Sequence, residues 1–315
     1  MDLSNRARQL INEQIKHWDL AHRNYEGLKK VKTKSFDFGD YHIDIQFNPE
    51  RIVSSAAKID AHSIKARPCF LCQNNLPAQQ KGLLIDGHSM LLVNPFPIFP
   101  EHLTIPNLHH TDQRITGNIG EMLDLAASLN EFTIFYNGPK CGASAPDHMH
   151  FQAGIKGFLP IEKDFLNEKC CNKICTIGWV TFWHWPDYQR GILTLSSKFK
   201  WALIGCFTNI YKQLQLLQPN EAEPMLNILL TFDHDEWVMH IIPRTLHRPK
   251  EYFETGEKQI LLSPASVDMG GVLITPREED FDKITEMDVR SIFDQVCLDP
   301  KTILKMIFHF SFNNL

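Results

Sequence analysis

The chain has 315 residues, of which 43% are hydrophobic, and its formal net charge is −5 at pH 7. At roughly 150 residues per domain, this length predicts two units or one fused pair with a sizeable core. The acidic balance excludes a long-range attraction to nucleic acid or anionic lipid, so any bound polyanion needs a local pocket. The chain has no apolar run of roughly 18 residues, and its N-terminus lacks the features of a signal peptide. We therefore expect a cytoplasmic globular protein that binds neither nucleic acid nor a membrane.

The first half of the chain alternates between helical and strand patterns. Apolar residues at helical spacing predict a helix over residues 3–25. Alternating residues 41–47 predict a strand, which we expect to pair with residues 36–38. Residues 91–155 then follow the order strand, strand, helix, strand, strand, with the helix over residues 113–130.

The second half repeats this order with unlike residues. The expected elements are a strand over 191–197, a helix over 198–217, strands over 225–233 and 236–244, and a helix near 285–296. No low-complexity linker separates the halves, which favours one intertwined body. We expect an α+β fold of two related half-units built on antiparallel sheets with packed helices, residues 1–165 forming the catalytic unit and residues 166–315 a degenerate one.

The segment GASAPDHMHFQAG, residues 142–154, carries the strongest functional signal. Because alternate strand residues share a face, His148, His150 and Gln152 are predicted to lie together, with apolar residues between them facing the core. The alternative is an ordinary half-buried strand whose polar side faces solvent. The preceding small-residue loop, NGPKCGAS, favours the functional interpretation, since successive backbone N–H groups in such a loop can bind an anion.

These residue types fit transfer of a phosphorus-containing group. A neutral imidazole at His150 can attack phosphorus and form a covalent phosphoramidate, if a carbonyl or carboxylate on its other nitrogen fixes the tautomer. The Gln152 amide can donate to a phosphate oxygen. Ser144 and the backbone at Gly142 and Ala143 can hold another oxygen.

The H-x-H-x-Q pattern after a Gly/Ser loop resembles the HIT-like nucleotidyltransferases. That branch includes galactose-1-phosphate uridylyltransferase, diadenosine tetraphosphate phosphorylase and the GDP-hexose phosphorylases. HMHFQA and FLPIEKDF resemble the GDP-hexose phosphorylases, PCFLC resembles the uridylyltransferases, and NILLTFDHDEWVMHIIPR resembles the phosphorylases of both kinds. The resemblance covers roughly residues 48–282 and implies a HIT-like fold.

The resemblance also implies residue roles. By it, His150 carries the nucleotidyl group, and Gln152 replaces the third histidine of the hydrolases and favours transfer over hydrolysis. Ser144 binds phosphate, Asn94 lies near the ribose, and Asn137 orders the site. One departure is that Ser144 stands four residues before the first histidine, where uridylyltransferases have three, so the loop must bulge.

A polyphosphate pocket in an acidic chain needs local cations. The segment before PCFLC supplies Lys58, Lys65 and Arg67, for which ordinary surface exposure is the alternative. In the second half, His240 is predicted near the place that corresponds to His150, and Arg244 can reach a phosphate or sugar.

Cys69 and Cys72 form a C-x-x-C, a spacing that lets two thiolates reach one Zn²⁺ from a tight turn. A metal-free pair packed in the core is the alternative. Some bacterial uridylyltransferases bind structural zinc through such a pair, and that resemblance implies Cys69, Cys72, His109 or His110, and His148 as ligands. The second cysteine group, within residues 170–175, matches no familiar site.

We expect an enzyme that transfers a nucleoside monophosphate through a nucleotidyl-histidine, in a ping-pong reaction. Its substrates would be a nucleotide sugar or dinucleoside polyphosphate, together with phosphate or a sugar phosphate. Zn²⁺ would be structural, whereas Mg²⁺ is not needed for the covalent step and can accompany the substrate. The alternatives are a HIT-type nucleotide hydrolase and a zinc-stabilised nucleotide-binding protein without catalysis. The sequence leaves the base, the sugar, the acceptor and the oligomeric state open, with a homodimer as one alternative.

Overall fold

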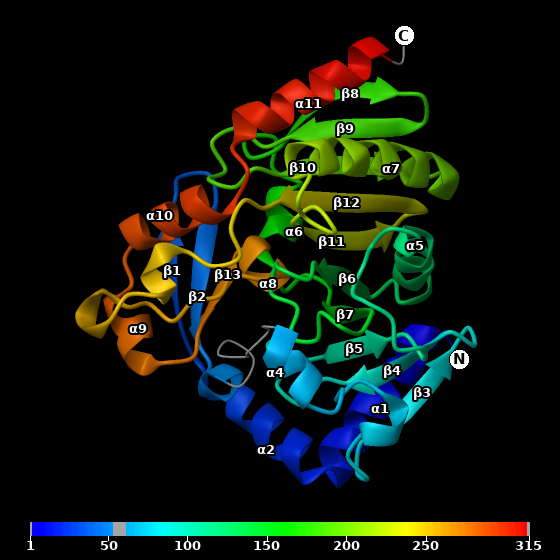
Figure 1. Cartoon of the computed structure of the whole chain (residues 1–315), viewed down its shortest axis with the longest axis vertical. Coiled ribbons are helices and arrows are strands. Elements are labelled where there is room, and N and C mark those ends of the chain that lie inside the picture. The colour runs from blue at the N-terminus through cyan, green and yellow to red at the C-terminus, as the bar shows by residue number, and fades with distance from the viewer. Residues whose placement is uncertain (1, 53–60, 314–315) are drawn as a thin grey trace.

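A ten-stranded antiparallel sheet forms the centre of the computed structural model, which describes residues 2–52 and 61–313 (Figure 1). Its strands are β3 (Gly82–Ile85), β4 (Ser89–Val93), β5 (His102–Pro106), β6 (Phe132–Asn137), β7 (His150–Ile155), β8 (Asn172–Ile177), β9 (Val180–His184), β10 (Leu193–Ser197), β11 (Leu226–Asp233) and β12 (Glu236–Pro243). Their order across the sheet is β3-β4-β5-β7-β6-β11-β12-β10-β9-β8. In Figure 1, β8 lies at the top edge of the sheet and β3 near the bottom.

A second, three-stranded sheet has the order β1-β2-β13, with β1 (Lys32–Asp37), β2 (His42–Phe47) and β13 (Val272–Thr275). The helices are α1 (Leu3–His17), α2 (Asp19–Leu28), α4 (Ala61–Ala66), α5 (Ile119–Ser128), α6 (Pro160–Asp164), α7 (Lys200–Leu217), α8 (Ser266–Met269), α9 (Glu278–Lys283), α10 (Glu286–Val296) and α11 (Pro300–Asn313). Single 3-10 turns occur at Pro49–Arg51, Gln73–Asn75, Lys250–Tyr252 and Gly256–Lys258. Across the described residues, no helix combines the length and the apolar character needed to cross a membrane.

The large sheet consists of two halves with the same strand connectivity. From each edge inward, three strands follow in chain order, and the last two strands of the half are exchanged: β3-β4-β5-β7-β6 in one half and β8-β9-β10-β12-β11 in the other. A long helix precedes the innermost strand in both, α5 before β6 and α7 before β11. The two innermost strands, β6 and β11, pair with each other. The expected α+β fold of two related half-units is confirmed, while the boundary between residues 165 and 166 stays a prediction.

The strand registers correct the position predicted for His240. One row of paired residues crosses the middle of the sheet through Thr104, Gln152, Phe135, Leu229, His240 and Thr194. Because the row is symmetric about the Phe135–Leu229 pair, His240 corresponds to Gln152. His240 was predicted near the place that corresponds to His150, and it lies two residues from that place, since the repeat could not be aligned more closely from unlike sequences.

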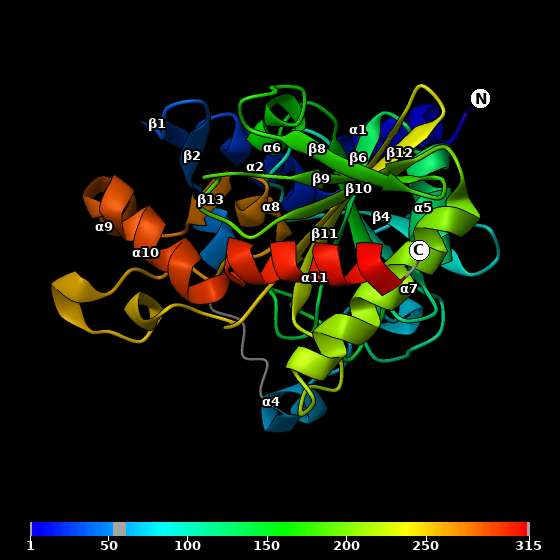
Figure 2. The same cartoon turned by 90° about the horizontal axis from the view of Figure 1, so that it is seen from above.

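The two faces of the large sheet have different cores. Side chains such as Ile134 and Leu230 pack with apolar residues of α1, α5 and α7 on one face. Their strand neighbours Phe135 and Leu229 point the opposite way, into a core shared with the three-stranded sheet, α8 and α10. Figure 2 shows α9, α10 and the three-stranded sheet on the left, and α5 and α7 on the right. Gln152, paired with Phe135, lies on the face of the second core.

Most expected elements are present, and two of the expected helices are changed. The helix expected over residues 3–25 is split at Trp18, whose backbone is extended and whose side chain is buried. The helix expected from residue 113 begins only at Ile119, because the side chain of Gln113 bonds to strand backbone instead. Gly117, with φ +85°, also lies before the helix.

Candidate active site

A cavity of about 540 Å³ opens on the face of the second core, beside the ends of β6 and β7. That volume is within the range of small-molecule sites. Its lining includes the sequence-predicted residues Arg67, Asn94, Asn137, Gly142, Ala143, Ser144, His150 and Gln152. Segments distant in the chain therefore meet here, as the resemblance implied.

His150 is the first residue of β7, and its imidazole lines the cavity although the residue is only 3% exposed. Its Nδ1 lies 2.8 Å from the carbonyl oxygen of His148. A carbonyl only accepts hydrogen bonds, so Nδ1 carries the proton and Nε2 keeps its lone pair. Burial lowers the pKa of His150 to about 4, so the ring is neutral at pH 7. A neutral ring with an unprotonated Nε2 is the form that can attack phosphorus.

Gln152 is oriented by a buried histidine that the sequence reasoning did not find. The Ile98 N–H donates to Nδ1 of His102, so Nε2 of His102 carries the proton and donates to Oε1 of Gln152 at 3.0 Å. Burial lowers the pKa of His102 to about 3, which keeps this ring neutral as well. Asn94 also donates to Oε1 of Gln152 at 3.3 Å. With its oxygen so engaged, the Gln152 amide offers its NH₂ group to a ligand.

The loop before β7 brings small residues to the cavity. Gly142 has φ +95°, and a Cβ there would lie 2.4 Å from the Cβ of Ala265, so only glycine fits. Ala143 and Ser144 follow it along the cavity wall. Asn137 accepts from the Ser266 backbone N–H through Oδ1, which ties the end of β6 to α8.

The charged side chains that line the cavity are, among described residues, mostly cationic. They are Arg51, Arg67 and Arg248, and one carboxyl, Asp268. Burial lowers the pKa of Arg51 to about 10, and Asp268 opposes that shift. One guanidinium nitrogen each of Arg51 and Arg67 is buried without a hydrogen-bond partner among the described residues. A buried N–H without a partner is costly, so both arginines suit an anionic ligand.

One predicted substrate residue, Arg244, does not line this cavity. Arg244 is fully buried, and its guanidinium donates to Asn227 and to the carbonyls of Pro264, Leu246 and Val296, among others. The prediction that Arg244 reaches a phosphate or sugar fails, because its guanidinium donors are already bonded to buried groups of the protein. Lys58 lies outside the described residues.

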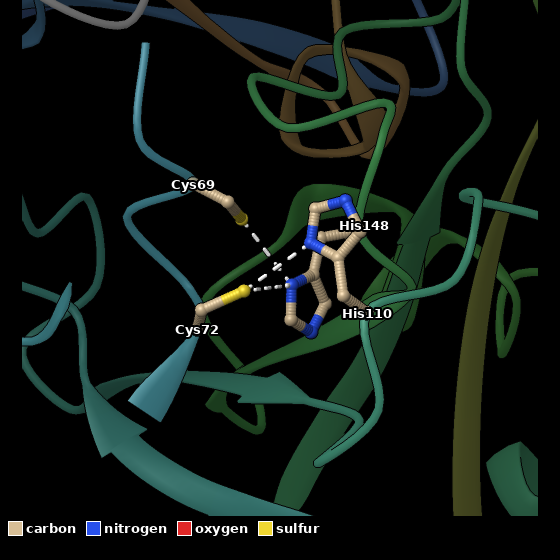
Figure 3. A group of neighbouring side chains, drawn as sticks. All are labelled: Cys69, Cys72, His110 and His148. Atoms are coloured by element: carbon tan, nitrogen blue, oxygen red, sulfur yellow. Dashed lines mark hydrogen bonds between the residues drawn. The ribbon is translucent and has the colours of Figure 1, made fainter. Parts of the chain in front are cut away.

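Beside the cavity, Cys69, Cys72, His110 and His148 bring four ligand atoms within 4.8 Å of one another (Figure 3). Sγ of Cys69 lies 3.2 Å from Nδ1 of His148, and Sγ of Cys72 lies 3.2 Å from Nδ1 of His110. His109 is outside this cluster, which decides between the two histidines that the sequence left open. His148 does not line the cavity, and its backbone carbonyl is the group that bonds Nδ1 of His150.

The donor set fits zinc. Two thiolates and two imidazoles are a common structural Zn²⁺ set, and soft sulfur ligands disfavour Mg²⁺ or Ca²⁺. Nε2 of His148 lies 2.8 Å from the carbonyl of Asn107, which turns Nδ1 toward the thiols as a metal-binding histidine requires. Burial would raise the pKa of Cys69, but the neighbouring His148 side chain and hydrogen bonds from the Leu71 and Cys72 backbone lower it to about 6. A thiolate, the form that binds metal, is therefore favoured.

Sequence reasoning missed His102, Gln113 and Arg51. His102 stands among apolar strand residues, where a histidine carries no distinctive pattern. Gln113 directly precedes a helical pattern, so the predicted helix included it. Arg51 follows an Asn-Pro turn whose position against the cavity depends on the pairing of β2 with β13.

Two family models match the chain. A domain of unknown function, DUF4922, matches residues 10–155, and the GDPGP1-like C-terminal domain matches residues 180–308. No curated protein sequence matches the chain.

Solved structures of the yeast Ap4A phosphorylase Apa2 share the fold. Its crystal structure is 18% identical with a TM-score of 0.58, over 89% of this chain and 94% of that one. The complex with Ap4A is 18% identical with a TM-score of 0.59, over 90% and 97%. The complex with AMP is 19% identical with a TM-score of 0.56, over 90% and 97%. The chain therefore shares the fold of these structures, in agreement with the HIT-like fold expected from its sequence, and its residues 180–308 match the model of the GDPGP1-like C-terminal domain.

Proposed function

We propose that the protein is a nucleotidyltransferase that moves a nucleoside monophosphate through a covalent bond to His150. The observation that carries this proposal is the state of the His150 ring. It lines a ligand-sized cavity, it is neutral, and its Nδ1 proton is committed to the His148 carbonyl, which leaves Nε2 as the nucleophile. Gln152, held by His102, stands on the same strand face to donate to a phosphate oxygen.

The proposed reaction has two displacements. Nε2 of His150 forms a bond to the α-phosphorus, and the bond from phosphorus to the bridging oxygen breaks, with its electron pair leaving on the departing phosphate group. The Nδ1 proton stays in place, and the His148 carbonyl stabilises the positive charge that develops on the ring. An oxygen of inorganic phosphate or a sugar phosphate then attacks phosphorus and releases His150.

The charge of the cavity supports a polyphosphate substrate. Among the residues that the structure describes, three arginines and one carboxyl line it, in a chain whose formal net charge is −5. Since two of these arginines have a buried nitrogen without a partner among described residues, a nucleotide sugar or a dinucleoside polyphosphate would supply the missing acceptors. The resemblance to GDP-hexose phosphorylases and the fold shared with an Ap4A phosphorylase agree with that class.

Cys69, Cys72, His110 and His148 would hold zinc in this proposal. With four protein ligands the ion has no open position, so it supplies structural cross-linking. The cluster joins the Cys69–Cys72 turn and the His110 loop to the segment before β7, which fixes the backbone that positions His150.

Labelling with substrates that carry ³²P on the α-phosphate tests the proposal. The panel is UDP-, GDP- and ADP-sugars and dinucleoside tetraphosphate, each with and without inorganic phosphate. We expect one substrate to leave an acid-labile label on the protein and the His150→Asn variant to take up none. Product release that requires phosphate identifies a phosphorylase, whereas equal release without it identifies a hydrolase. No label from any substrate would contradict the proposal.

A further inference from the structure

The strands β6 and β7 stop pairing just before the nucleophile. Their ladder runs from Phe132–Ile155 to Phe135–Gln152. Continued by two residues, the same register would pair Asn137 with His150. That rung is absent, and the side chain of Gln113, which is 0% exposed, occupies its place.

The Gln113 carboxamide bonds as a peptide group would. Its Oε1 accepts from the His150 N–H at 2.8 Å. Its Nε2 donates to the carbonyls of His150 and Asn137, both at 3.0 Å. On the other side of β7, His150 is paired with Pro106, but both backbone groups of His150 point toward Gln113, so that pair carries no hydrogen bond. Both backbone hydrogen-bonding groups of the proposed nucleophile are therefore bonded to one side chain from outside the sheet.

The loop that supplies Gln113 also supplies the cluster ligand His110. Between them, the carbonyl of Thr111 accepts from the Met149 N–H at 2.7 Å. The backbone N–H of Gln113 donates to Pro146 at 3.1 Å. One loop thus bonds to the segment before β7 at several points between the cysteine–histidine cluster and His150.

We propose that Gln113 is a positioning residue that holds β6 and β7 apart and places Nε2 of His150 in the cavity. Without the Gln113 amide, the Asn137 carbonyl and the His150 backbone have no hydrogen-bond partner, unless β6 and β7 move together and form the missing Asn137–His150 pair. Closure shifts the first residue of β7 and so displaces the ring. This inference rests on the proposed role of His150 as nucleophile, and a misplacement of about 1 Å in such a site can cost about 100-fold in rate.

Three variants separate positioning from stability. Gln113→Met fills the same space but removes all three bonds. Gln113→Glu keeps an acceptor for the His150 N–H and loses both donors. The matched control is Gln218→Met, because Gln218 also bridges two backbone groups, accepting from Met225 and donating to Arg244, at a site away from the cavity.

The first measurement is the single-turnover rate of protein labelling together with the nucleotide Kd. We expect Gln113→Met to slow labelling about 100-fold and Gln113→Glu about 10-fold, each with Kd changed less than about threefold. Gln218→Met should unfold at a lower temperature and label at the wild-type rate. A Gln113→Glu variant that folds and labels within about twofold of wild type would overturn the inference, even if Gln113→Met does not fold.

The second measurement needs no activity. The ¹⁵N signals of the His150 ring report which nitrogen carries the proton and whether the ring has moved. We expect both signals to shift in the two Gln113 variants and to stay unchanged in Gln218→Met, with the buried His240 ring as an internal reference. Unshifted His150 signals in Gln113→Met would refute the positioning role. Failure of the wild type to take up any label would instead refute the proposed function, and the ring signals would still decide the role of Gln113.

Discussion

The two halves of the large sheet have the same strand connectivity, but the residues at corresponding positions on one face have different surroundings. In the first half, the row through Gln152 borders a cavity of about 540 Å³. In the second half, His240 takes the corresponding position, and Thr194 lies 2.7 Å from its Nδ1. The rings of Trp185 and Phe165 lie 5.6 and 5.4 Å from the His240 ring, and Trp185 donates to Thr194 at 2.8 Å.

The difference shows that a shared fold does not determine where chemistry occurs. Both halves place a neutral, buried histidine on the same face, since burial lowers the pKa of His102 and of His240 to about 3. In the first half, the polar side chains lie beside the cavity and its arginines. In the second half, aromatic rings fill the corresponding space, so its histidine belongs to the core.

The largest expected effect comes from removing the imidazole on each side of this comparison. In His150→Asn, the amide can still donate to the His148 carbonyl, but no nucleophile remains. We expect the transfer rate to fall at least about 10³-fold. His240→Asn keeps a polar atom near Thr194 and should transfer at nearly the wild-type rate with reduced stability. Steady-state kinetics of both purified variants checks this, and an equal loss in both would show that the second half takes part in catalysis.

Metal removal should affect the first half alone. We expect one zinc per chain, and stripping it should lower the free energy of unfolding by on the order of 4 kcal/mol, the linkage expected for an ion well above its Kd. Cys72→Ser should lose the metal, whereas Cys171→Ser, in the second cysteine group, should keep it. Elemental analysis and chemical denaturation measure both quantities. Full stability in the metal-free protein would mean that the cluster is an ordinary group of packed side chains.

The sequence allowed the fold and the centre of the site to be predicted because both leave local patterns. Alternating strands and helical runs gave the element order, and H-x-H-x-Q placed His150 and Gln152. No local sequence pattern marks the hydrogen-bond partners of these two residues. Gln113 and His102 are single polar residues whose role depends on strand register, which the sequence did not fix. Arg244 carried a signal as a cation after a strand, but its environment is set by the C-terminal segment, over 50 residues away.

A smaller effect is expected from His102, which lies behind Gln152. His102→Leu removes the donor to Oε1 of Gln152 and lets the amide turn, so we expect kcat to fall about 30-fold, equivalent to roughly 2 kcal/mol, with KM little changed. Thr194→Val, which removes a hydrogen bond to His240 in the second half, should leave kcat unchanged. Combining His102→Leu with Gln152→Leu should cost little more than Gln152→Leu alone. Additive losses would show that His102 acts on something other than Gln152.

The smallest expected effect concerns His240, through the pH dependence of stability. Its pKa is about 3 in the folded protein because of burial and about 6.5 when unfolded. Between these values the unfolded chain binds a proton that the folded chain does not, so stability falls as pH falls from about 6.5 toward 3. His240→Asn removes this proton, so from pH 6 to pH 5 the variant should lose about 1.2 kcal/mol less stability than wild type. Chemical denaturation across this range measures the two slopes. Parallel slopes would mean that the His240 ring is protonated in the folded protein. A ring enclosed by Trp185 and Phe165 does not allow that charge, so this result would contradict the difference between the two halves of the sheet.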